Sequence, residues 1–163
     1  MILTSDDVSL SSDTGEEDST LGGVYHLLGL LDMFEFFGSK DIAQLDSAII
    51  NADRAMAVWD QANDLANKAE TLNLVGSLNQ IKGMASADHK LLQKAEDSLK
   101  ESLTIRESVL SRSDPALGQV LNTLGDFYTK QGNLPDAEEY YHREFARNLP
   151  LRVLYGPILR ECL

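Results

Sequence analysis

The chain has 163 residues, of which 43% are apolar and 25% are charged, as in an ordinary globular protein. Its net charge of −12, from 14 basic and 26 acidic residues, leaves no basic surface for phosphate groups and argues against binding of nucleic acid or of an anionic membrane. The single cysteine, Cys162, excludes an internal disulfide framework and a cysteine-based zinc site.

Residues 1–20 differ in composition from the rest of the chain. They hold six acidic residues, no lysine or arginine and no aromatic residue. Such a segment buries too little apolar surface to offset the entropy of ordering it, so we predict a disordered acidic tail. It could serve as a solubilising tail, or as an arm phosphorylated near Thr14 that binds a basic partner. The segment lacks the features of a signal peptide, and no apolar run in the chain reaches the roughly 18 residues of a membrane span, so we expect a cytoplasmic protein.

From Leu21 onward the apolar residues recur with the spacing of helices. The clearest runs lie within residues 41–59, 91–109 and 137–145. The residues that stop or start helices fall between these runs, at 38–41, 114–115, 132–135 and 156–157. No stretch alternates convincingly with period two, so the predicted fold is all-α.

A short pattern also recurs along the chain. The sequence Leu-Asn-Leu-Val-Gly at 72–76 returns as Leu-Asn-Thr-Leu-Gly at 121–125, and a weaker copy lies at 25–29. Each copy is followed by an alanine in the next helix: Gly29 by Ala48 and Gly76 by Ala95, both 19 residues later, and Gly125 by Ala137, 12 residues later. Small residues at these places let two antiparallel helices approach closely. A single helix pair cannot bury both of its faces, so we expect the pairs to stack into a solenoid.

The third copy, residues 114–141, resembles a tetratricopeptide repeat of the long-linker type found in kinesin light chains. The matching positions are Leu121, Leu124, Gly125 and Tyr128 in the first helix, Gly132 in the turn, and Ala137 and Tyr141 in the second helix. The second copy departs from the pattern at Asn79 and the first at Asp32, where an aromatic residue is usual. The resemblance implies a right-handed α-solenoid with repeats at about 21–60, 66–110 and 116–149.

A fourth repeat would start at Pro157, close to the last residue of the sequence. Solenoid ends need a polar cap, yet residues 151–163 are rich in leucine and other apolar residues. We therefore expect either an array truncated at its C-terminus, or another surface that covers this end, for example through oligomerisation.

No pattern in the sequence proposes a reaction, a cofactor or a metal. His26, His89 and His142 lie far apart, without the spacing of metal ligands. Adjacent carboxylates such as Glu138 and Glu139 point in different directions on a helix, and neither glycine-rich phosphate motif occurs. We therefore expect a protein that is not an enzyme.

Binding is the better hypothesis, because the first helices of stacked repeats line a concave groove. In the register of the repeat, the groove positions include His26, Leu30, Asn73, Ser77, Asn122 and Asp126. An asparagine amide can donate to and accept from a peptide backbone at once, and the resemblance implies this role for Asn73 and Asn122. An equally weighted alternative is that these amides hydrogen-bond the neighbouring helix pair.

Some relatives clamp an acidic C-terminal tail with basic residues in the groove. The comparable positions here are Glu70, Leu74, Gln119 and Thr123, so that ligand class is not expected. We expect a non-catalytic scaffold that binds a protein or peptide partner in the groove. The alternative is a sensor or regulatory array of a larger signalling protein whose effector domain lies outside this chain.

Overall fold

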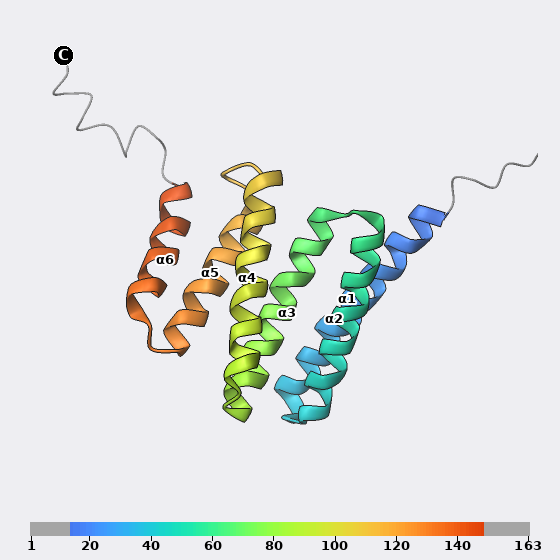
Figure 1. The fold of residues 1–163 in the computed structure, drawn as a ribbon, viewed down its shortest axis with the longest axis horizontal. Helices are drawn as coiled ribbons and strands as arrows, with labels where there is room; N and C mark the ends of the chain where they lie inside the picture. The colour runs from blue at the N-terminus through green and yellow to red at the C-terminus, as the bar shows by residue number, and fades with distance from the viewer. Residues whose placement is uncertain (1–13, 149–163) are drawn as a thin grey trace, which may run out of the picture.

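The computed structural model describes residues 14–148, which form six helices arranged in a row (Figure 1). Their bounds are α1 Thr14–Ser39, α2 Ile42–Ala62, α3 Leu65–Ser86, α4 His89–Val109, α5 Pro115–Lys130 and α6 Leu134–Asn148. No strand occurs in this part of the chain. The all-α prediction is therefore confirmed.

Short polar links separate the helices. An aspartate caps the N-terminus of four of them by accepting hydrogen bonds from backbone N–H groups of the first turn: Asp41, Asp64, Asp88 and Asp114. Pro115 follows the last of these at the first helical position, where its missing N–H costs nothing. Gly132 supplies a positive φ of 76° in the tight link between α5 and α6.

The helices pair as α1 with α2, α3 with α4 and α5 with α6, and the pairs stack as an all-α solenoid of the tetratricopeptide type. Within the first two pairs, the helices approach closely at the repeated glycine. A Cβ atom at Gly29 would lie 3.2 Å from the Ala48 carbonyl oxygen, and one at Gly76 would lie 3.2 Å from the Ala95 carbonyl oxygen. The predicted glycine–alanine contacts therefore exist, whereas Gly125 is covered by the ring of Tyr141 instead.

The N-terminal boundary differs from the sequence prediction. Helix α1 begins at Thr14, so residues 14–20, which we assigned to a disordered tail, are helical. Acidic residue types are favoured in the first turn of a helix because of its dipole, a local preference that the composition argument left out. Residues 1–13, and the start of a fourth repeat at 157, lie outside the described residues.

Candidate functional site

A groove of about 280 Å³ runs across the first helices of the three pairs. Its lining residues are His26, Leu30 and Met33 of α1, Glu70, Asn73, Leu74 and Ser77 of α3, and Gln119 and Thr123 of α5. The groove thus combines residues up to about 97 positions apart in the sequence, because stacking brings one face of each first helix to the same side. Among the predicted site residues, His26, Leu30, Asn73 and Ser77 come together here.

His26 is anchored to the floor between α1 and α3. Its Nδ1 lies 3.0 Å from the Thr71 hydroxyl, which also accepts a hydrogen bond of 3.0 Å from the Trp59 indole. The Thr71 hydroxyl thus links the side chains of His26 and Trp59, and either His26 Nδ1 or the hydroxyl is the donor between them, depending on the imidazole tautomer. Burial lowers the pKa of His26, and the nearby carboxylate of Glu70, 3.8 Å from Nε2, opposes this only in part.

Asn73 lies in the middle of the groove wall and is only 9% exposed. Its Oδ1 atom is buried and accepts no hydrogen bond from any residue between 14 and 148. A buried carbonyl without a partner costs free energy, so such atoms are rare in folded proteins. The amide oxygen of Asn73 is therefore not used in packing against the neighbouring helix pair, which was the alternative role for this residue.

Ser77 and Leu30 flank Asn73 without making specific polar contacts across the groove. The Ser77 hydroxyl donates to the Asn73 backbone carbonyl at 3.0 Å, one turn earlier in the same helix. Such a bond leaves the hydroxyl oxygen free to accept from a ligand. Leu30 is half-buried and adds apolar surface to the same wall.

Asn122 and Asp126 do not line this groove. Both are exposed on α5, and the Asp126 carboxylate accepts a hydrogen bond of 2.6 Å from the Tyr141 hydroxyl of α6. Asn122 holds in α5 the place that Asn73 holds in α3, but no further first helix follows α5 within the described residues. The open side of α5 therefore explains why the second asparagine is not enclosed.

Several residues of the groove wall were not among the predicted binding residues. Met33 was not singled out, although it follows Leu30 by three residues on the same face of α1. Glu70, Gln119 and Thr123 were considered only as places for a basic clamp, and the structure puts all three in the groove wall. Extending the register of the repeat by one helical turn in each direction could have found them.

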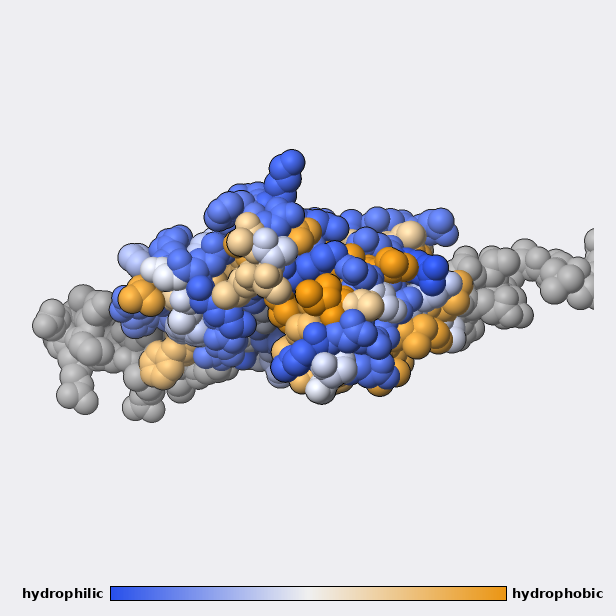
Figure 2. Space-filling model, turned by 90° about the horizontal axis from the view of Figure 1, so that it is seen from below, coloured by the Kyte–Doolittle hydropathy of each residue, from blue (hydrophilic) through white to orange (hydrophobic). Residues whose placement is uncertain are grey.

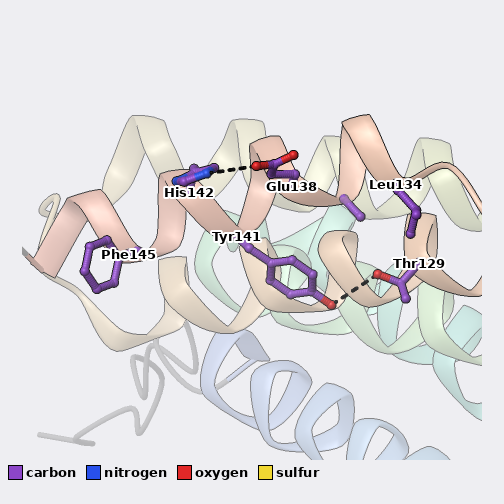
Figure 3. A pocket seen from close by; sticks show the side chains of 7 residues that line it. Thr129, Leu134, Glu138, Tyr141, His142 and Phe145 are labelled. Carbon is purple, nitrogen blue, oxygen red and sulfur yellow. Dashed lines mark hydrogen bonds and ion pairs between the residues drawn. The ribbon is translucent and has the colours of Figure 1, made fainter.

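A second cavity of about 480 Å³ lies on α6, at the end of the array (Figure 3). Its wall includes Leu134, Tyr141 and Phe145, of which Leu134 and Phe145 are both 63% exposed. The Tyr141 hydroxyl points toward Thr129 of α5 at 3.5 Å. This cavity is mainly apolar, and the titratable side chains in its wall are Glu138, Tyr141 and His142, of which His142 lies 3.4 Å from the Glu138 carboxylate.

Residues 14–148 offer neither a metal centre nor a membrane span. No group of three or more His, Cys, Asp or Glu side chains in this part of the chain could hold a metal ion. None of its helices is long and apolar enough to cross a membrane.

The comparison with protein families agrees with the arrangement of the last helix pair. The tetratricopeptide repeat family model matches residues 117–143, which cover most of α5 and the first part of α6. No curated protein matches the chain. Residues 117–143 thus match a tetratricopeptide repeat, and the helix pairs of residues 14–148 stack as the repeats of this family do.

Proposed function

We propose that the chain is a non-catalytic scaffold that binds an extended segment of a partner protein in the groove between α1, α3 and α5. Tetratricopeptide repeats generally mediate protein–protein interaction, and the family is typically non-catalytic. The observation that carries the proposal is the buried Oδ1 of Asn73, which has no donor in the described residues. A backbone N–H of a bound peptide would supply that donor once the amide turns toward the groove.

A second amide on α3 supports an extended ligand. The Nε2 atom of Gln80 is also buried without an acceptor in residues 14–148. Gln80 follows Asn73 by seven residues, which places it two turns later on the same side of the helix, about 10 Å away along the axis. Three residues of extended chain span about 10 Å, and the first N–H and the third carbonyl lie on the same edge. Gln80 lies outside the groove lining and its Oε1 accepts a hydrogen bond of 3.5 Å from Lys130, so a segment that pairs with both amides must extend past Ser77 toward Lys130.

The groove wall also restricts the charge of the ligand. Glu70 is the only acidic side chain that lines it, no lysine or arginine lines it, and burial lowers the pKa of His26, which disfavours the cationic imidazole. Leu30, Met33 and Leu74 supply apolar surface for side chains of the ligand. We therefore expect a neutral or basic segment with apolar residues, and we do not expect an acidic one.

The predicted positions on α5 fit a longer ligand. Asn122 and Asp126 continue the line of Asn73 and Ser77 by one repeat, and both are exposed. A segment that runs past Gln119 and Thr123 would reach them at the open end of the array. Their contribution to affinity should be smaller than that of Asn73, because solvent competes for exposed hydrogen bonds.

The test begins with selection of a binding peptide from a displayed library of random peptides, using the whole chain as bait. Calorimetry then compares the wild type with Asn73→Ala and with Gln61→Ala, which removes an exposed amide on α2. We expect Asn73→Ala to weaken binding by about 0.5–1.5 kcal/mol, or roughly 2- to 12-fold, and Gln61→Ala to leave it unchanged.

Thermal unfolding separates loss of binding from loss of the fold. Asn73→Ala removes a buried group that has no partner among the described residues, so its melting temperature should not fall. Normal affinity of Asn73→Ala, or weaker binding that appears only together with a lower melting temperature, would contradict the proposal.

A further inference from the structure

The outward side of α1 carries a continuous apolar stripe that no described residue covers. Its members are Leu21, Val24, Leu27, Leu28, Leu31 and Phe34, with exposed fractions between 40% and 67%. Figure 2 shows hydrophobic residues gathered toward the half of the molecule that contains α1 and α2. Helix α1 is thus apolar on both sides, since its other side packs against α2, and a helix of this kind is usually buried. We call these six residues the outer stripe.

The equivalent faces of the other first helices are buried. Aligning the three repeat glycines, Gly29, Gly76 and Gly125, places Leu31 at the position of Leu78 in α3 and Phe127 in α5. Leu78 and Phe127 are 0% exposed, because the preceding helix pair covers them, whereas Leu31 is 52% exposed. The outer stripe is therefore a face built for packing against another helix.

We propose that the outer stripe binds the outer stripe of a second copy of this chain, with the two α1 helices antiparallel. Residues 20, 24, 27, 31, 34 and 38 alternate in steps of four and three, which is the spacing of a helix–helix seam. An antiparallel pairing centred on residue 29 sets Val24 against Phe34 of the partner and Leu27 against Leu31. Each Phe34 ring then packs against the smaller Val24 side chain of the other copy, whereas a parallel pairing would place the two Phe34 rings against each other.

Area and charge both support a second copy as the occupant. From their exposed fractions, the twelve side chains of two outer stripes hold about 1,100 Å² of surface, above the roughly 1,000 Å² expected of a specific interface. Between Thr20 and Phe34 the only charged residue is Asp32, which faces α2 and accepts hydrogen bonds from Ser47 and Asn51. Two acidic chains can therefore meet here without like charges in contact. The dimer would carry two peptide grooves related by a two-fold axis, so it would bind a partner that has two such peptide segments with higher avidity than a single chain would.

Sedimentation velocity of the whole chain over a range of concentrations tests the dimer. We expect the wild type to dimerise, and Leu31→Asp to weaken the dimer at least tenfold without loss of helical circular dichroism. The matched control is Ile50→Asp, because Ile50 is 53% exposed on α2 and lies outside the outer stripe. A monomeric wild type, or equal effects of the two variants, would overturn the proposal.

Disulfide cross-linking in a Cys162→Ser background tests the antiparallel register. A mixture of Val24→Cys and Phe34→Cys chains should form a cross-linked heterodimer, while neither chain alone should cross-link. In the antiparallel pair, two copies of residue 24 are about 15 Å apart along the axis. Cross-linking of Val24→Cys alone would indicate parallel helices and contradict the register. Sedimentation of the chain with neutral lipid vesicles, lost in Leu31→Asp, would instead identify a lipid surface as the occupant and overturn the proposal.

Discussion

Gly76 of α3 lies directly under Leu99 of α4, so close that a Cβ atom on the glycine would be 2.5 Å from the Leu99 Cγ. Leu99 is fully buried in the hydrophobic core. The absence of a side chain at residue 76 is what allows Leu99 to fill the gap between the helices.

We expect Gly76→Ala to lower the free energy of unfolding by about 1–3 kcal/mol, because Leu99 must leave its position to make room. Urea denaturation followed by circular dichroism measures this change. Gly23→Ala is the matched control, since a Cβ atom there meets nothing within 4 Å and α1 should gain about 0.5–1 kcal/mol from the better helix former. Destabilisation by both substitutions would show that crowding is not the cause.

Ala87 ends α3 in the left-handed conformation, with φ 52° and ψ 35°. This conformation costs a residue with a Cβ atom roughly 1–2 kcal/mol, a cost that glycine does not have. We therefore expect Ala87→Gly to raise stability by about 1 kcal/mol in the same urea experiment. Ala57→Gly, at an exposed interior position of α2, should instead lower it by about 1 kcal/mol. A loss of stability in Ala87→Gly would refute this explanation.

His26 should make stability depend on pH below neutrality. Burial lowers its pKa in the folded chain below the ordinary value of 6.5. At a pH between the folded and the unfolded pKa of His26, the unfolded chain binds more protons than the folded chain does. Stability therefore falls as the pH falls through 6.5 toward the folded pKa. The fall amounts to at most about 1.4 kcal/mol for each pH unit in that interval.

Melting curves at pH 7.5 and 5.5 measure this effect. His26→Gln should lose that part of the pH dependence, whereas His142→Gln should keep it, since the side chain of His142 is 72% exposed. An unchanged pH profile in His26→Gln would show that protonation of this residue is not coupled to folding.

The sequence was sufficient for the helical class and for the repeat spacing, because both depend on local signals. The recurring glycines and alanines mark the close helix contacts at Gly29 and Gly76, and Asp114 with Pro115 marks the start of α5. The links at residues 63–64 and 87–88 carry no glycine or proline, and they escaped notice for that reason. Each of these links ends in an aspartate that caps the next helix. Aspartate is common throughout this acidic chain, so on its own it does not mark a helix start.

The site was predictable only in part, because a groove is formed by residues of several helices that are distant in the sequence. The register of the repeat placed His26 and Asn73 on the correct face of their helices. It could not show that α5 has an open side, so Asn122 was grouped with Asn73 although it lies outside the enclosed groove. The Thr71 hydroxyl accepts a hydrogen bond from the Trp59 indole and forms another with His26, and these two hydrogen bonds join α1, α2 and α3 without leaving a sequence pattern.

The peptide backbone itself offers the most direct test of the groove. Replacing one amide of a selected peptide by an ester removes a single N–H donor and leaves the side chains unchanged. If Asn73 accepts a backbone N–H, one ester position should weaken binding to the wild type by about 1 kcal/mol and have almost no effect on binding to Asn73→Ala. Ester peptides that lose the same affinity for the wild type and for Asn73→Ala at every position would contradict the account.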